Sequence, residues 1–297
     1  MLRHFVLLTA AAQLQAGVLT TPPAKPAEPT VLEEFMQPKI TATYYHDFNM
    51  ELHDGLGDLS INEIHLSAPV APLAKSDTFL VLANIDYRLF IADINTDVIA
   101  GRFDLHSLRV PLQAAWMPAD SKWFLFAILE PGLSTDFNSI NKESFDLTAS
   151  LDLGYQVSSD LVAAIGVYYS RNYGNNLVLP GVGLLWRPVP DFTLEISSNG
   201  FVPEWRFRDD WRLRCLFAPM GGRWTVEDHG TPETLRITGA KAGIELEHRL
   251  ASQCWATVGV GTNVLQHLHV EDGHQNDLLD QEVEGSMYVS GTVTWRF

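Results

Sequence analysis

Apolar and polar residues alternate one by one along most of this chain. In residues 145–158 every second residue is apolar or aromatic, and the residues between them are polar or glycine. A helix would bring Asp146 and Asp152 among the apolar residues, whereas a pleated strand separates the two classes. Residues 283–297 alternate in the same way. Both runs are about twice as long as an ordinary strand of a soluble protein, so they predict unusually long strands.

Short turns and longer polar connections separate the predicted strands in alternation. The short connections carry Pro, Ala, Asp and Ser between aromatic, His or Leu residues, which suits tight hairpins. They span residues 116–123, 155–161, 186–192, 205–211 and 248–255. The longer connections span residues 134–144, 171–176, 220–233 and 266–282. From Pro38 onward this pattern predicts about fourteen strands, or about twelve if two weak N-terminal segments are not strands.

The positions of the eight tryptophans test this arrangement independently. All of them except Trp224 lie close to a predicted short turn or to the C-terminus. An indole ring favours the membrane–water interface, because it is apolar with a single N–H to keep wet. Trp255 shares its strand face with Thr257 and Gly259, so we expect it to point inward. The others predict a belt at one membrane surface, formed by Trp116, Trp123, Trp186, Trp205, Trp211 and Trp295.

Together these features predict an all-β fold, a closed antiparallel up-and-down transmembrane β-barrel of about 12–14 strands. In hydrocarbon every backbone N–H and C=O needs a partner, so a sheet edge is not tolerated and the sheet must close. Short turns at one end and long loops at the other are typical of bacterial transmembrane barrels. A barrel that is apolar outside and polar inside needs no large hydrophobic core. This agrees with a mean hydropathy of +0.01.

The first 37 residues read differently from the rest of the chain. Residues 1–16 have a short basic start, an apolar stretch and small residues at candidate cleavage sites, which predicts a signal peptide. An ordinary buried first helix is the alternative interpretation. Residues 17–37 hold four prolines in close succession and predict an extended, Pro-rich periplasmic linker. The barrel is therefore expected to occupy residues 38–297.

The composition narrows the class of partner. Twenty Lys and Arg against 36 Asp and Glu give a net charge of −16, which argues against nucleic acid as a partner. The only cysteines, Cys215 and Cys254, leave no CxxC-type zinc site. A disulfide between them is an open alternative in an oxidising compartment, although Cys215 is predicted to face lipid. No cofactor is predicted.

Several segments resemble known outer-membrane proteins. The last strand, with apolar or aromatic residues at 293, Trp295 and Phe297, resembles the signal by which the outer-membrane assembly machinery recognises its barrels, although Gly291 is displaced by one position. Residues 106–111, 131–136, 167–172 and 179–183 are similar to an uncharacterised family of bacterial outer-membrane β-barrels. The resemblance covers about residues 40–297. It implies a barrel in the outer membrane of a Gram-negative-type bacterium, in contact with its lipids, and it transfers no catalytic residues.

A group of arginines on one predicted face forms the first candidate site. Arginine rings can make an anion-selective constriction in a pore. The interpretation we favour is a network in a closed lumen, in which the arginines pair with Glu204, Asp209 and Asp210, because lumen charges in a closed barrel must be paired. The arginines are Arg206, Arg208, Arg212 and Arg214.

The connection 266–282 forms the second candidate site because it is rich in histidines and carboxylates. A His-x-His pair puts two imidazoles on one side of a strand end, with carboxylates near enough for a divalent metal. No fixed ligand spacing is met, so a solvated acidic loop is the favoured interpretation. The acidic loops could also bind Ca²⁺ or bridge to lipopolysaccharide through divalent ions. The candidate ligands are His267, His269, Asp272 and His274, with Glu271, Asp277 and Asp280 beside them.

No spacing in the sequence marks a catalytic pair. A hydrolytic barrel needs a Ser/His or Asp/His pair on adjacent strands. His106, Ser107 and His248 are the residues at hand, and no enzymatic activity is predicted for them. The first functional hypothesis is a passive pore or transporter of small solutes. The alternatives are a closed-lumen barrel with a structural or surface-interaction role, and a soluble secreted all-β binding protein.

Overall fold

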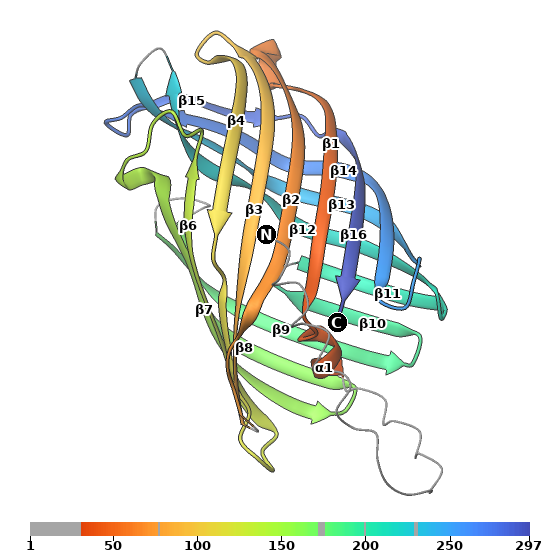
Figure 1. The fold of residues 1–297 in the computed structure, drawn as a ribbon. Coiled ribbons are helices and arrows are strands. Elements are labelled where there is room, and N and C mark those ends of the chain that lie inside the picture. The colour runs from red at the N-terminus through yellow and green to blue at the C-terminus, as the bar shows by residue number, and fades with distance from the viewer. Residues whose placement is uncertain (1–30, 77, 172–175, 199, 229–230) are drawn as a thin grey trace, which may run out of the picture.

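The computed structural model describes residues 31–297 except 77, 172–175, 199 and 229–230. The predicted signal peptide and most of the predicted linker lie outside the described residues. Within them the chain forms one short α-helix, two 3₁₀ turns and sixteen strands of a single sheet (Figure 1). None of the described helices combines the length and apolar character that crossing a membrane requires.

The elements follow one another along the chain with short gaps. The helix α1 spans Val31–Phe35, and the 3₁₀ turns η2 and η3 span His53–Gly55 and Lys142–Ser144. The strands are β1 Lys39–Glu51, β2 Gly57–Lys75, β3 Phe79–Thr96, β4 Ala100–Arg109, β5 Leu112–Trp116, β6 Trp123–Thr135, β7 Phe145–Ser158, β8 Leu161–Ser170, β9 Leu177–Val189, β10 Phe192–Ser197, β11 Gly200–Arg208, β12 Trp211–Asp228, β13 Thr231–Arg249, β14 Cys254–Glu271, β15 Asp277–Val283 and β16 Met287–Arg296.

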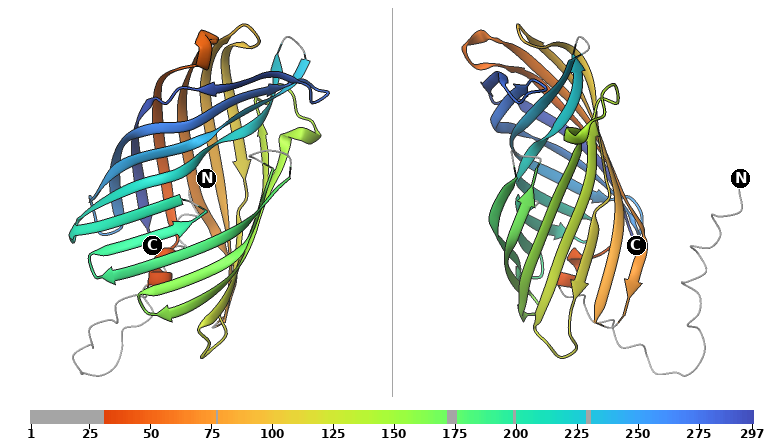
Figure 2. Two further views of the ribbon diagram at one scale, coloured as in Figure 1. Left: turned by 180° about the vertical axis from the view of Figure 1, so that it is seen from behind. Right: turned by 90° about the vertical axis from the view of Figure 1, so that its left-hand side faces the viewer.

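The sheet closes on itself, as the sequence predicts. The first strand β1 pairs antiparallel with both β2 and the last strand β16, and β16 pairs with β14, which continues the ring through β13. Two positions in the ring each hold two strands in tandem. β4 and β5 both lie between β3 and β6, and β15 and β16 both lie along β14. Sixteen strands therefore fill fourteen positions, and the predicted closed antiparallel barrel is confirmed (Figure 2).

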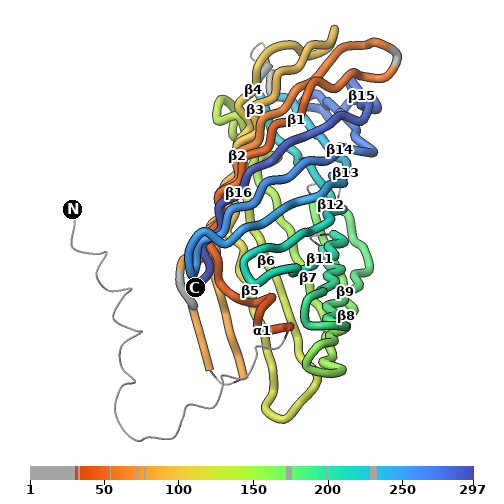
Figure 3. The backbone as a smooth tube through the Cα atoms, turned by 90° about the vertical axis from the view of Figure 1, so that its right-hand side faces the viewer, coloured from red at the N-terminus to blue at the C-terminus, as the bar shows by residue number. Residues whose placement is uncertain are grey.

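The five predicted short connections all form hairpins at the same end of the barrel. The predicted strand 145–158 coincides with β7, and each of the five predicted short turns joins two paired strands. The C-terminus and α1 lie at this same end (Figures 1 and 3). We call this end the turn side and the opposite end the loop side.

The outer wall of the turn-side half is apolar. Val182, Ile165 and Val258 expose 72%, 66% and 63% of their surface, and large apolar side chains are exposed on every neighbouring strand. Such a continuous apolar surface is unstable in water and suits contact with lipid tails. The inner wall at the same level is polar or charged, as in Glu63 of β2, which lies near the Lys241 amine.

The two faces exchange character toward the loop side. On the turn-side part of β2 the outer residues Leu66 and Val70 are apolar, whereas nearer the loop side the inner residues Leu59 and Ile61 are apolar and fully buried. In β14 a bulge at Leu265, which has a φ of 54°, helps this exchange by shifting the register against β13. The loop-side half is therefore built like a soluble protein, polar outside and dry inside.

A hydrophobic core fills the loop-side half, and this overturns the expectation that the barrel has none. β1 to β4 and β12 to β15 extend past β8 to β11 and enclose it (Figures 1 and 2). We call it the loop-side core. Its members are Met50, Leu52, Leu59, Ile61, Phe90, Ala92, Ile94, Ile99, Leu105, Trp224, Val226, Leu235, Ile237, Leu268, Val270, Leu279 and Val283.

The prediction of long loops at residues 220–233 and 266–282 is wrong, because both segments are mostly strand. Residues 220–233 are mostly the paired ends of β12 and β13, and residues 266–282 hold the end of β14 and most of β15. Their apolar residues recur at every second position, as in Trp224 and Val226, because they face the loop-side core. The strands continue into water because this core, rather than lipid, makes their extension favourable.

Candidate functional site

A charge network occupies the turn-side lumen, where several strands direct arginines and glutamates inward. The Glu247 carboxylate of β13 is 1% exposed and accepts hydrogen bonds from Arg296 at 2.7 and 2.9 Å. It also lies 3.6 Å from both Arg212 and Arg214. Glu245 adds a contact of 3.3 Å to Arg214. Three guanidinium groups therefore share the buried Glu247 carboxylate.

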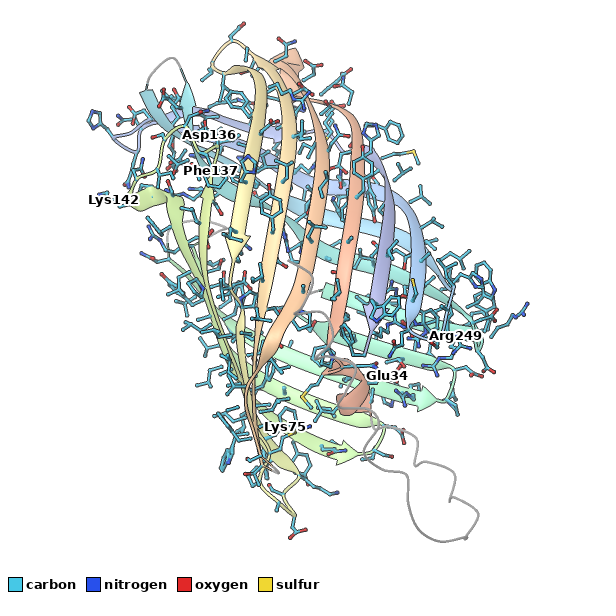
Figure 4. All side chains as sticks on the ribbon, viewed as in Figure 1. Glu34, Lys75, Asp136, Phe137, Lys142 and Arg249 are labelled. Atoms are coloured by element: carbon cyan, nitrogen blue, oxygen red, sulfur yellow. The ribbon has the colours of Figure 1, made fainter. Side chains whose placement is uncertain are left out.

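The helix α1 extends this network from the N-terminal side. Its Glu34 carboxylate pairs with Arg187, lies 3.1 Å from Arg206 and lies 3.7 Å from Arg212. Contacts with β8 and β9 hold α1 in place, and Val31 is 2% exposed. Glu34 thus lies at the turn side, opposite Asp136, Phe137 and Lys142 at the loop side (Figure 4). Residues 31–35, predicted as linker, form a helix because they find a charged partner inside the barrel.

The predicted arginine cluster is assembled only in part. Arg206, Arg212 and Arg214 lie in the network, and Arg212 also meets Glu204 at 3.1 Å. Arg208 is outside it, with a 67% exposed side chain that pairs with Asp210 at 3.3 Å. The inner-face parity of β9, β13 and β16 could have revealed most of the missed members. Those members are Glu34, Arg187, Glu245, Glu247 and Arg296.

A buried tryptophan, Trp255, contacts the arginines of the network. Trp255 is 5% exposed and faces inward, and the guanidinium carbons of Arg212 and Arg296 lie 4.7 and 4.6 Å from its ring centroid. Arg249 approaches the same ring at 5.5 Å. Cation–π contacts of this kind are favourable where the cation is shielded from water. They add to the ion pairs that keep the turn-side lumen occupied.

A single lysine lies between the charge network and the loop-side core. The Lys241 amine lies 3.7 Å from Asp47, 3.5 Å from Glu63 and 3.9 Å above the Tyr45 ring. Tyr288 adds a second ring at 5.3 Å. All of these side chains point into the lumen from β1, β2, β13 and β16. The middle of the barrel is thus filled by paired charges and aromatic rings.

A seam between β6 and β12 closes the loop-side core on one flank. Thr225 of β12 pairs with Thr135 of β6 in the one parallel contact among the described strand pairs. The Trp224 indole N–H donates to Ser107 Oγ at 2.9 Å, which ties β12 to β4. The backbone N–H of Asp136 donates to the Thr225 carbonyl at 3.1 Å. These contacts pull β12 across the lumen above the shorter strands β8 to β11.

The histidine-rich segment lies on the outer face of the loop-side half. Among the described residues, the His, Cys, Asp and Glu side chains close enough to hold a metal are His269, Glu271 and Asp277, whose ligand atoms lie within 4.8 Å of one another. Of the predicted ligands, only His269 belongs to this group. His267 pairs with Asp280, and this hydrogen bond lowers the pKa of Asp280, which lies outside the membrane-spanning part.

The other two predicted ligands are used elsewhere. The Asp272 carboxylate accepts hydrogen bonds from Asn276 and from the backbone N–H of His274, which close a turn and lower the pKa of Asp272. Both Asp272 and His274 line a hollow of about 450 Å³ on the loop side. Its other lining residues are Asn141, Lys142, Glu143, Arg223, Thr225, Glu233, Thr234, Gly273 and Gln275.

The tryptophans of the expected belt mostly face outward. Trp116, Trp123, Trp186, Trp205 and Trp295 are between 41% and 55% exposed. Trp211 is half-buried and stacks on His248 with ring centroids 4.2 Å apart. Phe297 is 53% exposed at the end of the chain.

The residues considered for catalysis are hydrogen-bonded to other groups, and the two cysteines are not bonded to each other. His106 bonds to Tyr87 at 2.8 Å, whereas Ser107, its neighbour on the opposite face of β4, is buried against Ser134 at 3.0 Å. They therefore cannot act as a nucleophile–base pair. His248 bonds to the Asp210 carbonyl at 3.1 Å. Both Cys215 and Cys254 are free thiols.

The chain matches one protein family and is similar to several solved structures of outer-membrane proteins. The family described as "Domain of unknown function (DUF6268)" matches residues 110–296. No curated protein matches the chain. Solved structures with similarity include an outer membrane channel from Pseudomonas putida F1, at a TM-score of 0.45 and 9% identity, with 94% of this chain and 100% of that chain covered.

Two further structures are similar. The P. putida toluene transporter TodX has a TM-score of 0.41 at 10% identity, covering 91% of this chain and 93% of that chain. The KdgM porin in complex with disordered oligogalacturonate has a TM-score of 0.36 at 10% identity, covering 86% and 99%.

Proposed function

The chain belongs to the DUF6268 family, and we propose that it is an outer-membrane β-barrel closed along its axis, which acts at the cell surface through its loop-side half. A closed barrel with an apolar outer wall and short turns at one end is the architecture of bacterial outer-membrane proteins. Its partners in this role are outer-membrane lipids along the apolar wall. The assembly machinery would recognise the last strand through Trp295 and Phe297.

The observation that supports closure is the loop-side core. Seventeen buried apolar side chains fill the cross-section at that level, contributed by strands from both sides of the barrel. Ions and sugars cannot cross a packed apolar region without losing their hydration, which is costly. The polar lumen below it would then be a vestibule that ends blindly. A surface-interaction role fits the polar outer wall and the hollow of about 450 Å³ at the loop side.

Conductance tests this proposal directly. The purified, refolded protein in a planar lipid bilayer is expected to give no stepwise conductance in salt solution, because the loop-side core interrupts the water column. A general porin reconstituted in the same lipids serves as the positive control. Regular conductance steps from the unmodified protein would contradict the proposal.

A second candidate function, sideways passage of small solutes, is favoured by a break in the wall. On its β11 side, β12 is paired up to Phe217, and its next strand contact is at Thr225 with β6. Between them, residues 218–224 have no strand partner on that side among the described pairings. This gap in the strand pairing lies below the seam, and the side chains of Met220, Arg223 and Trp224 there are buried, so a solute would leave by this route only when they move aside.

A variant of α1 separates the two candidates. Glu34→Gln removes the charge that holds α1 to three arginines, so α1 is expected to leave the vestibule more often. With Val31→Cys as a reporter, and with both native cysteines replaced by serine, thiol labelling should accelerate about tenfold, equivalent to about 1.4 kcal/mol. The control carries Glu34 intact. Unchanged labelling would show that the charge of Glu34 does not hold α1 in the lumen.

The same variant is then tested in the bilayer. If the barrel is closed, Glu34→Gln remains silent even though α1 is released. If it conducts, the path must leave through the wall beside β12, and the second candidate function replaces the first.

A further inference from the structure

Two neighbouring strands, β14 and β15, bring one histidine and three carboxylates together on the outer face of the loop-side half. His269 of β14 lies directly opposite Asp280 of β15 on one side and Arg236 of β13 on the other. Glu271 follows two residues later on the same face of β14, and Asp277 begins β15. These side chains lie on the outer face, because Leu268 and Val270 between them point into the loop-side core; His269 and Glu271 are mostly covered, and Asp277 is exposed.

The spacing of the ligand atoms fits a small divalent metal. His269 Nε2 lies 3.1 Å from a Glu271 oxygen and 3.1 Å from an Asp277 oxygen. Around a tetrahedral zinc ion with bonds of about 2.1 Å, ligand atoms lie about 3.4 Å apart. A slight outward movement of Asp277, whose side chain is 67% exposed, opens the remaining space. The site therefore needs little rearrangement to accept the ion.

The histidine is also oriented as a metal ligand requires. Its other nitrogen, Nδ1, lies 3.1 Å from Asp280, and a carboxylate in this position holds the ring and its tautomer in zinc sites. The Nε2 atom is buried and makes no well-directed hydrogen bond, although two carboxylate oxygens lie close to it. A nitrogen lone pair directed between two carboxylates has a natural partner in a cation.

We propose that His269, Glu271 and Asp277 bind one zinc ion, with Asp280 positioning His269 and a water completing the tetrahedron. A nitrogen ligand with two carboxylates favours zinc over calcium or magnesium, which prefer oxygen alone. The Glu271 oxygen that lies near His269 Nε2 also accepts a hydrogen bond from Arg236 at 3.1 Å, and a carboxylate oxygen has a second lone pair for the metal. The two carboxylates and a neutral imidazole carry the charge that a divalent ion neutralises.

Zinc at this site would clamp β15 to β14. Asp277 is the first residue of β15, and Leu279 and Val283 of the same strand belong to the loop-side core. Fixing the start of β15 would hold these two residues in the core. The site therefore couples a surface ligand to the packing of the loop-side half, whether or not the barrel conducts.

Titration calorimetry on the full, refolded chain in detergent, with Zn²⁺ alone as the probe, tests the proposal. One ion per chain is expected, and Co²⁺ in its place should give the visible absorption of a tetrahedral site. His269→Ala and Asp277→Ala should each weaken binding by about 100-fold, and Asp280→Asn by about 10-fold to 100-fold. His274→Ala is the matched control, because His274 contributes only its backbone N–H nearby, and it should bind Zn²⁺ normally.

Hydrogen exchange supplies a readout that does not depend on affinity. Zn²⁺ should slow amide exchange in β15 of the unmodified protein and leave exchange in the Asp277→Ala variant unchanged. Heat-modifiable gel migration confirms that each variant is folded, and Asp277→Ala removes an exposed side chain without touching the core. Binding that survives both His269→Ala and Asp277→Ala would place the ion elsewhere and overturn the proposal, as would the absence of binding to the unmodified chain.

Discussion

Replacing Trp224 with alanine should lower the free energy of unfolding by about 3–5 kcal/mol, the usual cost of removing a large aromatic side chain from a core. Trp224 is 1% exposed, packs against Phe90 with ring centroids 4.8 Å apart, and donates to Ser107. No neighbour can fill the space it leaves, because the surrounding strands are fixed by their pairing. Denaturant titration in lipid vesicles, followed by circular dichroism, measures the loss.

The conservative variant Trp224→Phe separates packing from hydrogen bonding. It keeps most of the apolar volume and loses the indole N–H, so it should cost about 1–2 kcal/mol. A loss below about 1 kcal/mol for Trp224→Ala would show that the loop-side core is not tightly packed. Axial closure would then lose its physical basis.

Replacing Glu247 with glutamine should cost about 3–5 kcal/mol, since breaking a buried ion pair leaves charge uncompensated. Glu247 is 1% exposed and accepts both hydrogen bonds from Arg296, while Arg212 and Arg214 lie 3.6 Å away. Among the described contacts, Arg296 would lose its only carboxylate partner, and Arg212 and Arg214 would each lose one of theirs. The same denaturant titration measures the effect.

Removing one arginine together with Glu247 is the matched test. The double variant Glu247→Gln with Arg296→Gln should recover at least half of the loss, because it removes the closest uncompensated charge. A cost below 1 kcal/mol for Glu247→Gln alone would show that water screens the turn-side lumen, as it does for exposed ion pairs. The vestibule would then be wetter than the burial of Glu247 indicates.

The turn-side half of the barrel could be predicted from the sequence because its environment acts on each strand alone. Lipid outside and polar groups inside impose the same alternation on β7 and β16. The residues of each turn are enough to determine its hairpin. The tryptophans at 116, 123 and 205 follow from the same local chemistry. None of these features depends on which distant strand lies opposite.

The loop-side half could not be predicted in the same way. Residues 220–233 and 266–282 contain enough Gly, His and acidic residues to resemble loops, and their strands are favourable only because their apolar faces meet in one core. A signal was present in β2, where the apolar positions move from one face to the other. That exchange indicates a dry interior only when several strands are known to surround it.

The candidate sites divide in the same manner. Sequence parity placed Arg206, Arg212 and Arg214 on one inner face, but their partner Glu247 comes from β13, and Glu34 comes from a segment with a linker-like composition. The spacing of His269 and Asp277 along the chain matches no metal motif, and only the pairing of β14 with β15 brings them together.

The sequence by itself determined that this chain is a closed barrel with an apolar wall, because alternation and turn chemistry are properties of each strand and its immediate neighbours. Only the tertiary structure decided that one end of the barrel is packed dry, which carboxylates face which arginines, and that a histidine meets two carboxylates. Those outcomes depend on contacts between strands far apart in the chain, and no local pattern encodes which of them become neighbours.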